Sequence, residues 1–166
     1  MSTNKYRNHL VIYTEDNATS QLAESFLNND GFNRYKANVL PPCRGWNDAV
    51  ESAIRDTQLG TGLRRVVVLI DLDKQNCRIN EIRKKIPPQY ADKIFVIGWS
   101  GKIENLKSAL ACSGKGFEKL GEKLAQDCLA GCRGAWESEY FSQFRDAYYE
   151  CSEKQQIQNL IDLLKN

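Results

Sequence analysis

The stretch that most constrains the fold is "VVVLIDLDKQN", residues 66–76. Five consecutive apolar residues, 66–70, are followed there by Asp71, Leu72 and Asp73. A short continuous apolar run is typical of a strand that is covered on both faces of a parallel sheet. Alternation along the strand sends Asp71 and Asp73 to the same side. Such an ending has two interpretations: a strand that stops at the surface, or part of a divalent-metal site.

Similar apolar patterns predict the rest of the sheet, with the third strand at 64–73 and the others at 9–15, 34–40 and 93–99. Helical spacing of apolar residues predicts helices between and after these strands, at 17–31, 45–59, 79–86, 102–110, 116–131 and 138–166. For the last helix, a break near Cys151-Ser152 is the alternative. The order predicts an α/β fold, with a central, mostly parallel four-stranded sheet flanked by helices and an all-helical C-terminal third.

The 166 residues fit one ordinary domain. We expect an α/β core at 9–110 with a helical extension at 111–166. A formal net charge of +2 does not by itself indicate nucleic-acid binding. No apolar run reaches the roughly 20 residues that span a bilayer, and the N-terminus lacks a secretion signal, so we expect a cytoplasmic protein without membrane contact. The chain has six cysteines but no C-x-x-C pair, and its single histidine is His9. This composition favours reduced thiols over a zinc site.

A second acidic group, Glu15 and Asp16, ends the first predicted strand. Ligands of open α/β sheets bind in the crevice beyond the carboxyl ends of the strands. If the first and third strands are parallel neighbours, Glu15 and Asp71 lie at one edge. Converging carboxylates repel each other unless a cation lies between them, and oxygen ligands favour Mg²⁺ or Mn²⁺. The competing interpretation is turn chemistry, because Asp is common where strands become loops.

Two segments, "VIYTEDNAT" (11–19) and "VVVLIDLDKQN" (66–76), together resemble the Toprim domain, in which an acidic residue ends the first strand and D-x-D ends a later one. The segment "FVIGWSGKIENLKSAL" (95–110) resembles the next strand and helix of Toprim-like proteins of defence systems. Toprim domains occur in topoisomerases, primases, small bacterial nucleases and OLD-family nucleases. The resemblance implies a Toprim-like, Rossmann-like fold.

The activity that this resemblance implies is Mg²⁺-dependent phosphodiester cleavage of nucleic acid, with DNA favoured over RNA. The chain is too short to be a topoisomerase or a primase alone. It would therefore act as a small nuclease, or as the Toprim subunit of a larger, defence-related complex that contains an ATPase. The C-terminal helices are the candidate surface for such a protein partner, and the oligomeric state stays open.

Under the resemblance, three acidic residues would bind Mg²⁺ or Mn²⁺ and carry the catalysis: Glu15, Asp71 and Asp73. Glu104, after the fourth predicted strand, is a further candidate metal ligand. Lys74 and Lys102 are candidate contacts to a substrate phosphate. For Glu104 and the two lysines, a solvated surface side chain is the competing interpretation.

Two functions of other classes stay open. A receiver-like signalling domain also has an acidic pair after its first strand, and it would be phosphorylated on Asp71, with Ser100 near the end of the fourth strand. That fold needs a fifth strand, which the sequence does not predict. A catalytically silent interaction module is favoured by Asp16, because the first Toprim strand usually ends in Glu-Gly.

The C-terminal third carries two apolar features. Phe117, Leu120, Leu124 and Cys128 form a stripe at helical spacing, and an aromatic cluster follows it, formed by Trp136, Tyr140, Phe141 and Phe144. We expect the stripe to be core, with an interaction helix as the alternative. The aromatic cluster is either core or a partner interface.

Overall fold

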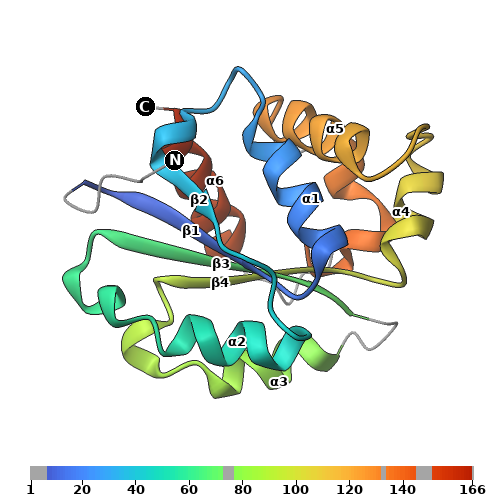
Figure 1. Ribbon diagram of the computed structural model, residues 1–166. Coiled ribbons are helices and arrows are strands. Elements are labelled where there is room, and N and C mark those ends of the chain that lie inside the picture. The colour runs from blue at the N-terminus through green and yellow to red at the C-terminus, as the bar shows by residue number, and fades with distance from the viewer. Residues whose placement is uncertain (1–6, 73–76, 132–133, 145–150, 166) are drawn as a thin grey trace.

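The computed structural model describes the backbone of residues 7–72, 77–131, 134–144 and 151–165 (Figure 1). Four strands form one sheet in the order β2-β1-β3-β4, and every pairing is parallel. The strands are β1 (His9–Thr14), β2 (Ala37–Val39), β3 (Arg64–Asp71) and β4 (Ile94–Trp99). The α-helices are α1 (Asn17–Leu27), α2 (Trp46–Ile54), α3 (Cys77–Lys85), α4 (Ile103–Ala109), α5 (Glu118–Leu129) and α6 (Cys151–Lys165). The predicted α/β class and the four-stranded parallel sheet are confirmed.

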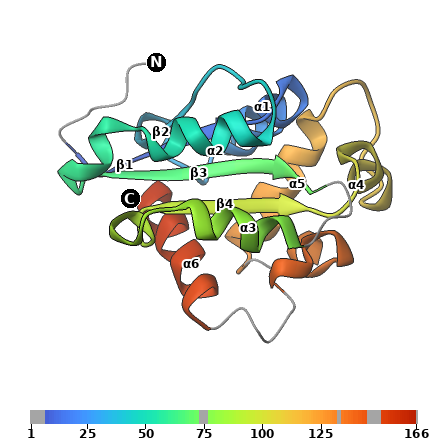
Figure 2. The same cartoon turned by 90° about the horizontal axis from the view of Figure 1, so that it is seen from below.

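Helices cover both faces of this sheet. In Figure 1, α1 and α5 lie above the sheet and α2 and α3 below it, and Figure 2 shows α2 and α3 from their own side. The side chains of β3 alternate between two cores. Val67 packs on the side of α1, α5 and α6, whereas Val66, Val68 and Ile70 pack on the side of α2 and α3. The unbroken apolar run of β3 therefore reflects burial on both faces, as predicted.

The strand predicted at 34–40 is shorter than expected. Arg34–Lys36 forms a 3-10 helix, and β2 begins only at Ala37. The side chain of Asn33 accepts a hydrogen bond from the backbone N–H of Tyr35, which starts the 3-10 turn in place of a strand.

Two predicted helices are also interrupted. The helix expected at 45–59 ends at Ile54, and a 3-10 helix follows at Thr57–Thr61, begun by the side chain of Asp56. The helix expected at 138–166 is wrong in its first part, because Glu139–Phe144 is a 3-10 helix, and α6 begins at Cys151, where the alternative placed a break. The residues from 145 to 150 lie outside the described part of the chain.

The apolar stripe of α5 packs against α1. Gly121 allows close contact, because a Cβ atom there would lie 2.6 Å from the Cβ of Ser25 and 2.7 Å from the carbonyl oxygen of Leu22. Leu120 and Leu124 are buried in the same core. The prediction that this stripe is core is therefore confirmed.

The aromatic cluster also belongs to this core where it is described. The ring centroids of Trp136 and Phe141 lie 4.8 Å apart, and both side chains are buried. The indole N–H of Trp136 donates to the carbonyl oxygen of Leu124 at 2.8 Å. The side chain of Phe144 lies outside the described part, and a protein partner for the C-terminal helices stays a prediction.

A buried polar network joins the start of the sheet to the segment after α2. Arg64 donates through Nη1 to Asp56 Oδ2 at 2.6 Å and through Nε to His9 Nε2 at 3.0 Å. Tyr13 donates its hydroxyl to the same Asp56 oxygen at 3.1 Å. Because His9 also bonds to the backbone oxygen of Arg7 at 2.7 Å, both of its ring nitrogens have partners. The network gives His9 a structural role.

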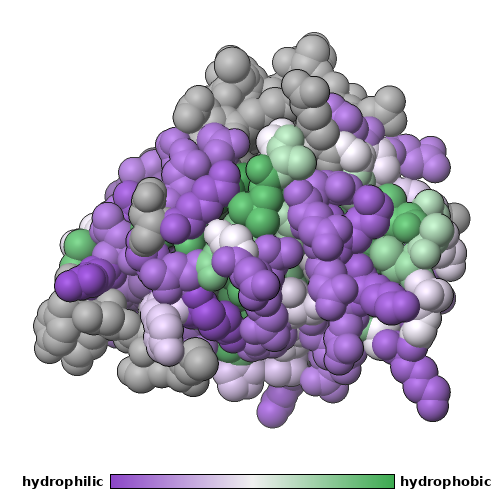
Figure 3. Space-filling view, turned by 90° about the horizontal axis from the view of Figure 1, so that it is seen from above, coloured by the Kyte–Doolittle hydropathy of each residue, from purple (hydrophilic) through white to green (hydrophobic). Residues whose placement is uncertain are grey.

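The surface offers little exposed apolar area. Tyr35 is the one large hydrophobic side chain that is exposed among the residues with described side chains. The face shown in Figure 3 is mostly hydrophilic, with small, separate hydrophobic areas. Among the cysteines with described side chains, Cys43, Cys112 and Cys128 form no disulfide.

None of the described helices has the length and apolar character needed to cross a lipid bilayer.

Candidate functional site

The strand order places a change in the direction of the connections between β1 and β3. The chain leaves β1 toward α1 on one face of the sheet, whereas it leaves β3 toward α3 on the opposite face (Figure 1). Neighbouring parallel strands whose connections diverge in this way form the topological switch point at which open α/β sheets bind ligands. The switch point lies at the carboxyl ends of the two strands.

Two of the predicted site residues lie at this edge. In the sheet register, Thr14 pairs with Leu69 and Asp71 pairs with Trp99. Glu15 directly follows Thr14, and Asp71 lies two residues beyond Leu69, the partner of Thr14. Both acidic residues are half-buried. The first and third strands are thus parallel neighbours, as the metal-site hypothesis requires.

The chain turns immediately after β1. The consecutive carbonyl oxygens of Thr14 and Glu15 both accept hydrogen bonds from the β2–α2 loop. The N–H of Cys43 donates to Thr14 at 2.8 Å, and the N–H of Gly45 donates to Glu15 at 3.0 Å. Consecutive carbonyls in a regular strand point to opposite neighbours, so the strand geometry has ended by Glu15. The loop before α2 therefore covers the end of β1 and holds the backbone of Glu15 in place.

Asp16 has a structural role at this turn. Its Oδ1 accepts bonds from both the backbone N–H and the hydroxyl of Thr19, each at 2.8 Å, and so it caps the N-terminus of α1. Its backbone is extended, with φ of −152° and ψ of −179°, which is accessible to every residue type. The turn after Glu15 therefore does not need the glycine that is usual in Toprim domains.

The end of β3 is fixed on both sides of Asp71. Leu72 donates its backbone N–H to the carbonyl oxygen of Trp99 at 3.0 Å, and its buried side chain packs against Gly98. Arg78, in the first turn of α3, donates through Nη1 to the carbonyl oxygen of Asp71 at 3.0 Å. Sequence reasoning missed Arg78. Its position in the first turn of the helix that follows D-x-D was the available signal.

Two buried polar atoms without a partner lie at the same edge. Thr14 Oγ1 and Trp99 Nε1 are fully enclosed and make no hydrogen bond to any described residue. Thr14 and Trp99 are the last residues of β1 and β4, and Trp99 stands beside Asp71 in the register. An unsatisfied buried polar group costs about 1–3 kcal/mol and calls for a water, an ion or a functional explanation. Both atoms are therefore unsatisfied polar groups at the edge of the sheet that carries Glu15 and Asp71.

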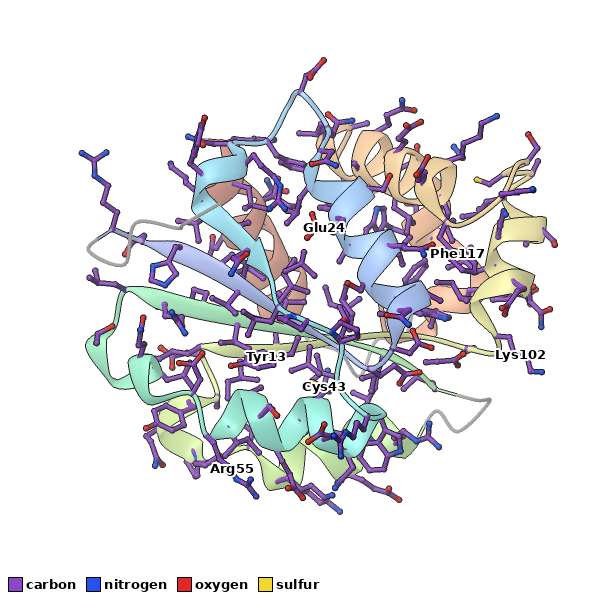
Figure 4. All side chains as sticks on the ribbon, viewed as in Figure 1. Tyr13, Glu24, Cys43, Arg55, Lys102 and Phe117 are labelled. Atoms are coloured by element: carbon purple, nitrogen blue, oxygen red, sulfur yellow. The ribbon has the colours of Figure 1, made fainter. Side chains whose placement is uncertain are left out.

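The remaining candidates are distributed as follows. Lys102 directly precedes α4 and Glu104 lies in its first turn, and both side chains are exposed. Figure 4 shows Lys102 pointing outward beyond the carboxyl end of β4. Asp73 and Lys74 lie outside the described part of the chain, so their geometry stays a prediction.

The donor set of this edge matches the chemistry of Mg²⁺. Among the described residues, no group of three or more Asp, Glu, His or Cys side chains is placed to hold a metal ion. Asp73 is not one of the described residues. Mg²⁺ needs fewer protein ligands than zinc, because it keeps several waters and binds through one or two carboxylates plus substrate phosphates. Glu15 and Asp71 are carboxylates of the type that such an ion accepts.

Comparisons of the chain with models of protein families, with curated proteins and with solved structures find no match.

Proposed function

We propose that the protein is a Toprim-like, Mg²⁺-dependent phosphodiesterase that cleaves nucleic acid, alone or as the catalytic subunit of a larger complex. One observation carries the proposal. The carboxyl ends of the adjacent parallel strands β1 and β3 bear Glu15 and Asp71 at the topological switch point, beside two buried polar groups that lack partners. Mn²⁺ is the alternative ion, because it accepts the same oxygen ligands.

In this proposal, Asp71, and Asp73 by the resemblance, would hold Mg²⁺. The ion would supply charge stabilisation for the phosphoryl transition state and a lowered pKa of a nearby water. Glu15 would accept the proton of the attacking water, or complete the ligand set. The bond from Arg78 to the Asp71 carbonyl oxygen keeps the end of β3 in place, so Arg78 is a positioning residue.

The test combines metal binding with cleavage. Mg²⁺ and Mn²⁺ are titrated calorimetrically into the wild type and Asp71→Asn, and the same samples are incubated with plasmid DNA and single-stranded RNA. Asp92→Asn is the matched control, because Asp92 is exposed in the turn before β4, at the opposite edge of the sheet.

We expect Asp71→Asn to lose metal binding and cleavage together while the control keeps both. The variant should fold at least as stably as the wild type in the absence of metal, because it removes repulsion between crowded carboxylates. Cleavage at the wild-type rate by Asp71→Asn would contradict the catalytic assignment. Absence of metal binding by the wild type would favour the silent interaction module.

A receiver-like function is the second candidate, because the order β2-β1-β3-β4 also begins the flavodoxin-like sheet of receiver domains. No fifth strand follows β4 within the described residues. The distinguishing experiment is incubation with acetyl phosphate and Mg²⁺. A phosphate adduct on Asp71, measured by intact mass and absent from Asp71→Asn, would favour the receiver and not the nuclease.

A further inference from the structure

Two exposed cations flank the acidic edge of the sheet. Arg44 lies in the β2–α2 loop, between Cys43 and Gly45, whose N–H groups bond to the carbonyls of Thr14 and Glu15. The backbone of Arg44 is therefore held over the end of β1. Lys102 follows the end of β4 by three residues and points outward (Figure 4).

These cations stand on opposite sides of Asp71. In the sheet, β3 lies between β1 and β4, so the edge presents Arg44, the acidic centre and Lys102 in that order. Neighbouring strands are about 4.8 Å apart, which separates the ends of β1 and β4 by about 10 Å.

Neither cation is used elsewhere in the described structure. The side chains of Arg44 and Lys102 make no hydrogen bond or ion pair with any described residue. By contrast, the exposed Arg55 pairs with Glu51 at 3.0 Å, and Lys123 pairs with Asp127 at 3.3 Å. A group of carboxylates repels an approaching phosphate, and cations on either side of it offset that repulsion for a polyanion long enough to reach both.

We propose that Arg44 and Lys102 are the two ends of a phosphate track that holds a single nucleic-acid strand across the carboxyl edge of the sheet. The strand runs from the β1 side to the β4 side, with the phosphodiester to be cleaved over Asp71. This inference rests on the proposed function and adds to it the direction in which the substrate crosses the site.

The test measures binding without catalysis. A fluorescently labelled octadeoxythymidylate is titrated with the protein in EDTA at several salt concentrations, and the anisotropy gives the affinity. The variants are Arg44→Gln and Lys102→Gln. Arg55→Gln and Lys165→Gln are the matched controls, because neither residue lies at the carboxyl edge of the sheet. Arg55 follows the C-terminal end of α2. Lys165 follows Leu164, whose carbonyl oxygen accepts a hydrogen bond from the N–H of Asn33, before β2. Figure 4 places Arg55 at the far side of the molecule from Lys102.

Each track variant should bind more weakly, and its slope of log affinity against log salt should fall by about 0.7, the value for one phosphate contact on a single strand. The double variant should lose about twice as much slope, and the controls should keep the wild-type value. Circular dichroism of each variant establishes that it is folded.

The outcomes separate this inference from the proposed function. Selective loss of binding by the two track variants, without cleavage by any form of the protein, would support the track and contradict the nuclease. Cleavage by the wild type with unchanged binding by Arg44→Gln and Lys102→Gln would overturn the track and leave the nuclease standing. Equal losses in the track variants and the controls would also overturn it, because they would indicate a diffuse field.

Discussion

The unpartnered hydroxyl of Thr14 gives a stability prediction with an unusual sign. Thr14 is fully buried at the end of β1, and its Oγ1 has no hydrogen-bond partner among the described residues. Thr14→Val keeps the shape of the side chain and replaces the hydroxyl by a methyl group. We expect the metal-free variant to be more stable than the wild type by about 1–3 kcal/mol, the cost of an unsatisfied buried polar group.

Thr19→Val is the matched control. Thr19 is equally buried, but its hydroxyl donates to Asp16 Oδ1 at 2.8 Å. The same substitution should therefore destabilise the protein by about 1.5–3 kcal/mol, the net contribution of a hydrogen bond to a charged group. Two substitutions of identical chemistry are thus expected to change the free energy of unfolding in opposite directions.

The assay is urea unfolding of the three proteins in EDTA. For a chain of this size, 1 kcal/mol shifts the Tm by about 2–4 °C, so thermal unfolding also resolves the difference. Destabilisation by Thr14→Val in EDTA would refute the reasoning, because it would mean that the hydroxyl already has a partner.

Three further predictions concern the surrounding structure. Asp56→Ala should cost about 3–5 kcal/mol in urea unfolding, because it leaves the mostly buried guanidinium of Arg64 without its carboxylate; a loss below 1 kcal/mol would contradict this. Burial and the adjacent Asp56 raise the pKa of Tyr13 above its usual value near 10, so the wild type should lose stability above about pH 10, where the unfolded phenol ionises first. Tyr13→Phe should show a flatter stability profile between pH 9 and 11, and parallel profiles would exclude the effect. Gly98→Ala would place a Cβ 2.8 Å from Leu72 Cγ and so displace Leu72, the neighbour of Asp71. The substitution should therefore weaken Mg²⁺ binding. Unchanged binding by calorimetry would show that Leu72 does not position the site.

Local sequence patterns determined the strands β1, β3 and β4 and the buried face of α5. The apolar run of β3 was long and unbroken enough to indicate a strand buried on both faces, and the helical spacing of the α5 stripe indicated a buried helix face. Both follow from periodicity, because burial selects apolar side chains at every position of a central strand and on one face of a helix. The shorter β2 was not predicted, because the side chain of Asn33 starts a 3-10 turn within an alternating pattern.

The acidic residues that end β1 and β3 could also be chosen from the sequence, but their arrangement could not. Asp16 looked like a departure from a glycine turn, and only the fold shows it capping α1 through Thr19. Arg78 and the enclosed atoms of Thr14 and Trp99 became candidates only in three dimensions. The physical reason is that a hydrogen bond, or its absence in a buried position, depends on which strands are neighbours, and strand order is a long-range property. The sequence by itself therefore determined these three strands, the buried face of α5 and the candidate acids, whereas the tertiary structure decided which polar groups surround those acids.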